Sequence, residues 1–119
     1  MKPSAQSGVS RDAALSQAMN GLWQRFLPEI AARVAILESA AAAVAARSLS
    51  AEQRDAAHAA AHKLAGVLGT FGLARGTELA RELELAFGSE SPADPDAAEK
   101  LAVIAAELRS TIENRLPSA

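Results

Sequence analysis

Two histidines on one expected helix are the side chains of this chain best suited to chemistry. His58 and His62 are its two histidines, and the chain has no cysteine. The lack of cysteine excludes disulfides, thiolate metal sites and a cysteine nucleophile. A neutral imidazole keeps one nitrogen lone pair free, so each ring has the chemistry of a nucleophile or of a metal ligand.

The spacing of the two histidines allows both rings to lie on one helix face, as metal ligands do in zinc peptidases. That pattern also needs a glutamate directly after the first histidine, where Ala59 stands here. The nearest carboxylate on the same face is that of Asp55. We therefore expect no metal site, and interpret His58 as a solvent-exposed neighbour of His62.

The apolar residues around His62 predict that its ring faces solvent. A helix advances about 100° per residue, which places these apolar residues on the side opposite His62. They are Ala57, Ala60, Leu64, Leu68 and Phe71. A histidine of the core would lie on that stripe. Four residues fall within about 40° of His62, and we expect them to form a partner-binding face: Asp55, His58, Gly66 and Gly69.

Gly66 and Gly69 leave the two turns that follow His62 without side chains. Glycine inside a helix costs about 1 kcal/mol relative to alanine, and this chain uses alanine widely elsewhere. Bare backbone beside an exposed histidine favours close approach by another macromolecule. The alternative is that the two glycines only loosen the end of the helix.

The elements that position His62 are expected to be helices throughout. Apolar residues recur at helical spacing over residues 11–27, 29–47, 51–68, 75–87 and 96–115. Pro28 either begins a second segment or kinks a longer helix, and Ser50 with Gln53 forms a capping-box pattern. We predict an all-α fold, an up-down-up-down four-helix bundle with an additional N-terminal helical segment, over residues 11–116. Residues 1–10 are expected to be a disordered lead-in.

Composition excludes several classes of function. The net charge is -2 with no basic block, which argues against binding to nucleic acid. No apolar run reaches the roughly 20 residues that span a bilayer, and residues 1–10 lack the apolar core of a secretory signal. We therefore expect a cytoplasmic protein. No glycine-rich nucleotide loop is present, so a kinase activity of its own is not expected.

The run from His62 to Leu73 resembles the signature of the histidine-containing phosphotransfer (HPt) domain family. It is especially similar to the phosphotransfer domains of chemotaxis-type histidine kinases. The matching residues are His62, Leu64, Gly66, Gly69, Thr70, Phe71, Gly72 and Leu73, and the match continues over residues 79–84. The family fold agrees with the helical bundle expected from periodicity.

This resemblance implies a role for individual residues. His62 is the phosphoacceptor. Glu84 stands where many members carry an acidic or amide residue that hydrogen-bonds the histidine ring, which keeps Nδ1 protonated and leaves Nε2 as the nucleophile. Many members also carry a lysine three residues after the histidine, where Ala65 stands here. Lys63 is the nearest cation, although it projects about 100° away, and is the candidate charge partner of the phosphoryl group.

The resemblance also implies partners. These are response-regulator receiver domains and a sensor or hybrid histidine kinase, and the receiver supplies an aspartate and Mg²⁺. The chain would then need no cofactor of its own and act as a monomeric phosphocarrier rather than as an enzyme. The alternative is a degenerate HPt-like helical adaptor that binds receiver domains without phosphoryl transfer.

Overall fold

Four α-helices make up almost all of the described chain. A computed structural model describes residues 3–88 and 95–115, with side chains for residues 11–88 and 96–115. The helices are α1 (Pro3–Ala45), α2 (Ala51–Thr70), α3 (Ala74–Gly88) and α4 (Ala98–Glu113), and a short 3-10 helix, η1 (Pro95–Ala97), precedes α4. No strand occurs in these residues, which confirms the predicted all-α bundle. None of these helices is long and apolar enough to cross a bilayer.

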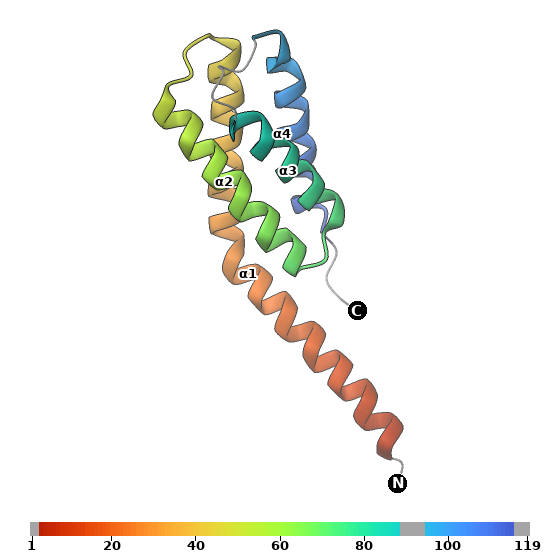
Figure 1. Cartoon of the computed structure of the whole chain (residues 1–119). Coiled ribbons are helices and arrows are strands. Elements are labelled where there is room, and N and C mark those ends of the chain that lie inside the picture. The colour runs from red at the N-terminus through yellow and green to blue at the C-terminus, as the bar shows by residue number, and fades with distance from the viewer. Residues whose placement is uncertain (1–2, 89–94, 116–119) are drawn as a thin grey trace.

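Helix α1 is one long helix that runs through Pro28 (Figure 1). The expected N-terminal segment and the first bundle helix are therefore one continuous helix. Pro28 is tolerated inside it although a proline removes one helical hydrogen bond and its ring presses on the carbonyl of the preceding turn. The expectation of a disordered lead-in was wrong for residues 3–10, which belong to α1; residues 1 and 2 lie outside the described residues. Pro3 suits the first helical position, where its missing N–H has no intrahelical partner anyway.

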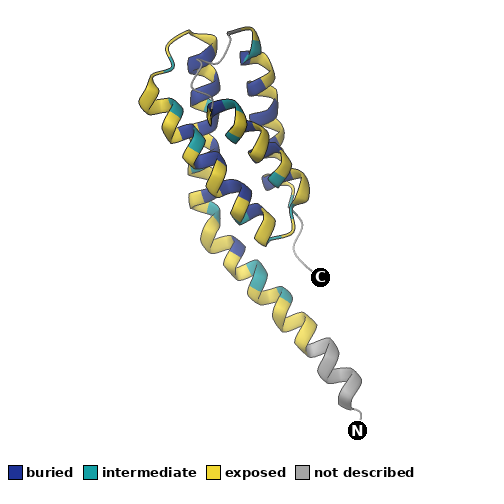
Figure 2. Ribbon diagram, viewed as in Figure 1, coloured by how far each residue is buried: buried dark blue, intermediate teal, exposed yellow. Residues whose placement is uncertain are grey.

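Only the C-terminal half of α1 belongs to the bundle, and the other half extends beyond it (Figure 1). Trp23 is the first buried residue of α1 among those with described side chains, and Figure 2 shows burial concentrated on the inner faces of the bundle. The core is mostly aliphatic, with Trp23 and Phe87 as its buried aromatic residues, and contains no buried polar side chain in the described residues. Its largest fully buried side chains are Phe87, Ile30, Leu37, Leu64, Leu68, Leu79, Leu83, Leu108 and Val34.

Helices α2 and α3 form an antiparallel pair whose ends are set by the local sequence. The predicted capping box begins α2: Ser50 Oγ accepts from the Gln53 amide at 3.0 Å, and Gln53 Oε1 accepts from the Ser50 amide at 3.0 Å. Gly72 turns the chain between the helices with φ of +74°, a conformation that favours glycine. A Cβ on Gly76 would lie 3.0 Å from Leu68 Cδ1, so glycine there allows the two helices to pack closely.

Aromatic side chains close the end of the bundle where α2 stops. Trp23 and Phe71 meet edge to face with ring centroids 5.2 Å apart, and Phe26 packs on Phe71 at 6.3 Å. The Arg115 guanidinium lies 4.8 Å from the Trp23 ring centroid. Phe71, which the family signature contains, is therefore a packing residue in this chain.

Two bidentate ion pairs join α4 to its neighbours. Arg109 donates to the Glu38 carboxylate of α1 at 2.8 and 2.6 Å. Arg75 of α3 donates to the Glu107 carboxylate at 2.8 and 3.1 Å. The hydrogen bond from Arg109 lowers the pKa of Glu38, and that from Arg75 lowers the pKa of Glu107. Both carboxyls therefore release their protons more readily in the folded state.

These lowered pKa values predict a loss of stability in acid. Each carboxylate contributes its full share to the free energy of unfolding above its unfolded pKa of about 4.3. This contribution disappears as the pH falls through the lower folded pKa. We expect the urea midpoint of unfolding to fall between pH 5 and 3, and Glu38→Gln to make this decline shallower. Wild type and Glu38→Gln should differ by at most about 1 kcal/mol in the unfolding free energy lost in acid, since the pair of Glu38 and Arg109 is partly exposed. Glu99→Gln is the control, and an unchanged slope in Glu38→Gln would contradict the assignment.

Candidate functional site

The expected contact between His62 and Glu84 spans the interface of α2 and α3. The His62 side chain is 73% exposed, and its Nδ1 lies 2.8 Å from Glu84 Oε2. A carboxylate can only accept, so Nδ1 is the protonated nitrogen and donates. In the neutral ring Nε2 is then the unprotonated nitrogen, and its lone pair is available as a nucleophile.

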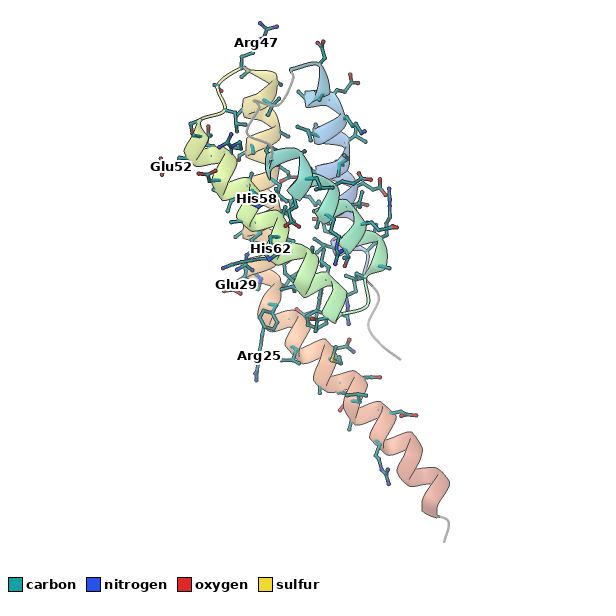
Figure 3. All side chains as sticks on the ribbon, in the orientation of Figure 1. Arg25, Glu29, Arg47, Glu52, His58 and His62 are labelled. Atoms are coloured by element: carbon teal, nitrogen blue, oxygen red, sulfur yellow. The ribbon has the colours of Figure 1, made fainter. Side chains whose placement is uncertain are left out.

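The second histidine holds the backbone of the same glutamate. His58 lies one turn before His62 on α2 (Figure 3), and its Nδ1 donates to the Glu84 carbonyl oxygen at 3.0 Å. The ring is half-buried rather than solvent-exposed as we expected, because α3 packs against it. A Cβ on Gly88 would lie 3.0 Å from the His58 ring, so glycine makes room for this contact. His58 therefore fixes the position of α3 relative to His62.

An open groove runs beside His62 between the two helices. Its lining residues are His58, His62, Ala65, Gly66, Arg81, Glu84, Leu85 and Gly88. A Cβ added to Gly66 would have no other atom within 4 Å, which places bare backbone next to the histidine. Leu85 is 78% exposed on the rim. The groove therefore offers a mostly apolar surface with one reactive ring at its edge.

Three of the residues expected at the site do not line this groove. The Asp55 carboxylate lies 3.6 Å from the Arg54 guanidinium and is 76% exposed. A Cβ on Gly69 would meet Thr77 Oγ1 at 3.6 Å, so Gly69 faces α3 rather than open space. Lys63 is exposed but outside the lining residues. Its role as a charge partner stays a prediction.

Sequence reasoning missed four residues that the structure adds to the groove: Ala65, Arg81, Leu85 and Gly88. The available signal was the spacing from Glu84, because residues three before and four after it share its helix face. A search for that spacing would have selected Arg81 and Gly88.

The described residues hold no group of three or more histidine, cysteine, aspartate or glutamate side chains that could bind a metal ion. At the site, α3 engages Nδ1 of both histidines through the carbonyl and the carboxylate of Glu84. What the arrangement provides is one exposed nucleophilic nitrogen. Glu84 is placed to stabilise the positive charge that the His62 ring acquires when Nε2 forms a bond.

Comparison with known proteins agrees with this geometry. A family model described as Hpt domain matches residues 21–115. Protein RcaC of Microchaete diplosiphon is 30% identical over 96 residues, which cover 81% of this chain and 15% of that protein. This chain thus spans a small part of RcaC's length. No solved structure gives a significant match.

The matched range includes the histidine, the glutamate that holds it and all the groove residues. It lies within the predicted domain of residues 11–116, whose boundaries stay a prediction. The chain therefore belongs to the Hpt domain family, whose members are phosphocarriers rather than kinases and have a histidine phosphotransfer role in phosphorelays.

Proposed function

We propose that this chain accepts a phosphoryl group on His62 from a kinase or from a receiver-domain aspartate, and passes it to the receiver domain of a response regulator. One observation carries the proposal. Glu84 holds Nδ1 of His62 at 2.8 Å, so the exposed ring in its neutral form presents an unprotonated Nε2. The His62 ring and the bare backbone of Gly66 line the same groove.

The transfer needs no base on this chain. The Nε2 lone pair attacks the phosphorus of an aspartyl phosphate, the phosphorus–oxygen bond breaks, and the aspartate leaves as a carboxylate. The imidazole ring becomes cationic and keeps its Nδ1 proton, which remains bonded to Glu84. The reverse attack, by an aspartate of the next receiver, returns the ring to its neutral state with Nδ1 still protonated.

The chain's task is to present the ring in line with the donor, because phosphoryl transfer depends mainly on positioning and on neutralising charge. Mg²⁺ on the receiver would supply part of that neutralisation. The groove suits a folded partner. It is open, Gly66 has no side chain, and Leu85 offers an exposed apolar contact.

We extend the proposal to a cytoplasmic monomer whose partners are a sensor or hybrid histidine kinase and response-regulator receiver domains. The lack of cysteine suits a reducing compartment. The site residues all come from one chain, so a single copy holds a complete phosphoacceptor.

The first test is labelling of His62. Phosphorylated receiver domains should transfer acid-labile, alkali-stable label to the wild-type chain and none to His62→Gln. The exposed side chain predicts a change in unfolding free energy within about 0.5 kcal/mol, measured by urea denaturation. Full labelling of His62→Gln would refute the assignment. A wild-type chain that binds receivers without accepting label would instead support the helical adaptor.

The contact with Glu84 predicts a specific spectroscopic change. In Glu84→Ala the Nδ1 proton loses its acceptor, and the neutral ring should shift towards the tautomer protonated at Nε2, which blocks the nucleophile. We expect transfer to slow by about tenfold or more, and nitrogen NMR of the ring to report the tautomer. Glu84→Gln keeps an acceptor oxygen and should retain more of the rate. Equal tautomer populations in wild type and Glu84→Ala would contradict this role.

Bulk at Gly66 should separate transfer from stability. A leucine there has open space in the free chain and improves helix propensity, so Gly66→Leu should gain a few tenths to about 1 kcal/mol in unfolding free energy. It should nevertheless slow transfer from a receiver, because the side chain stands where the partner approaches. Gly21→Leu is the matched control, since Gly21 also has no atom within 4 Å of an added Cβ and lies in α1. Equal transfer rates for both variants would disprove the docking role of Gly66.

A further inference from the structure

A phosphoryl group on His62 creates a charge problem that the proposed function does not answer. The group carries close to two negative charges near neutral pH, in the way that phosphorylated side chains do. It would be attached to a ring that already contacts the carboxylate of Glu84. Before a receiver arrives, and after it leaves, the only protein cations that can neutralise this charge are those of this chain.

Arg81 is the permanent cation among the residues that line the groove. The rest of the lining comprises two histidines, one glutamate and the neutral residues Ala65, Gly66, Leu85 and Gly88. Lys63 follows His62 in sequence, but it lies outside the lining residues. Lys63, the neighbour of His62 in sequence, is therefore less well placed than Arg81 on the facing helix α3.

The register of the two helices places Arg81 beside the turn that follows His62. His62 meets Glu84, and Gly69 faces Thr77, so Arg81 lies between these contacts on α3 and opposite Ala65 and Gly66. The small residues opposite leave its long side chain free to extend along the groove. A guanidinium can then approach oxygens on Nε2 without displacing Glu84 from Nδ1.

The donors of Arg81 are not used elsewhere in the described part of the chain, where it has no hydrogen bond or ion pair. Two other arginines differ in this respect. Arg75 pairs with Glu107 and Glu78, and Arg109 pairs with Glu38 and Glu113. An arginine with free donors offers a planar fork that matches two phosphoryl oxygens.

We propose that Arg81 binds the phosphoryl oxygens of phosphorylated His62, as a charge partner contributed by α3 rather than by the helix that carries the histidine. This inference rests on the proposed function, because it requires His62 to be the phosphoacceptor. It makes the phosphoryl site a joint product of both helices. Glu84 holds the ring on one side, and Arg81 binds the transferred group on the other.

The test uses the full chain loaded with phosphoramidate, a small-molecule donor that needs no partner protein. Phosphorus NMR then follows the second ionisation of the phosphoryl group against pH, and His62→Gln identifies its resonance.

Removing one charge at about 4 Å in water-like surroundings changes the phosphoryl pKa by about 0.5 to 1 unit. We expect Arg81→Ala to raise the phosphoryl pKa by that amount and Arg81→Lys to restore part of the shift. Arg25→Ala, an exposed arginine on α1 outside the groove, is the matched control (Figure 3).

The outcomes separate this inference from the proposed function. A wild-type chain that takes no label on His62 overturns both. A loaded chain whose phosphoryl pKa is the same in wild type and Arg81→Ala overturns only the role of Arg81. A larger shift in Lys63→Ala than in Arg81→Ala assigns the contact to Lys63 and overturns the inference as well. A phosphoryl pKa that rises with salt concentration in wild type but not in Arg81→Ala would support a direct charge contact.

Discussion

The hydrogen bond from Nδ1 of His62 to the carboxylate of Glu84 is the interaction on which the site depends. An exposed imidazole is free to exchange its proton between two nitrogens and to rotate about its side-chain bonds. A single acceptor at 2.8 Å removes both freedoms. The acceptor belongs to a different helix, so the chemistry of the ring depends on how α2 and α3 are held together.

Several local features serve that packing. His58 bonds the backbone of Glu84, and the absence of side chains at Gly76 and Gly88 lets α3 approach α2 closely. Glycine in this chain thus has three separate uses. Gly72 reverses the chain, Gly76 and Gly88 allow contact within the protein, and Gly66 leaves open space outside it. The same residue type therefore meets different physical needs at different positions.

Helical periodicity predicted the fold well, because the helices bury apolar stripes within the bundle and the start of α2 is encoded locally by the capping box at Ser50. It left open how Pro28 would act, since a proline in an exposed turn is compatible with either outcome. His62 and its exposure followed from the same periodicity, and the contact with Glu84 from family resemblance. The half-burial of His58 and the place of Arg81 did not follow, because both depend on the register between α2 and α3, which no single helix determines.

The extension of α1 beyond the bundle has a consequence for how the molecule behaves in solution. Its principal extents are 68 × 21 × 19 Å and its radius of gyration is 17.8 Å, whereas a compact chain of this length has about 13 to 14 Å. A rod of this kind tumbles slowly end over end and leaves a gel-filtration column early. A single copy would therefore elute like a larger globular protein, and its mass has to be measured by light scattering or sedimentation rather than from elution volume.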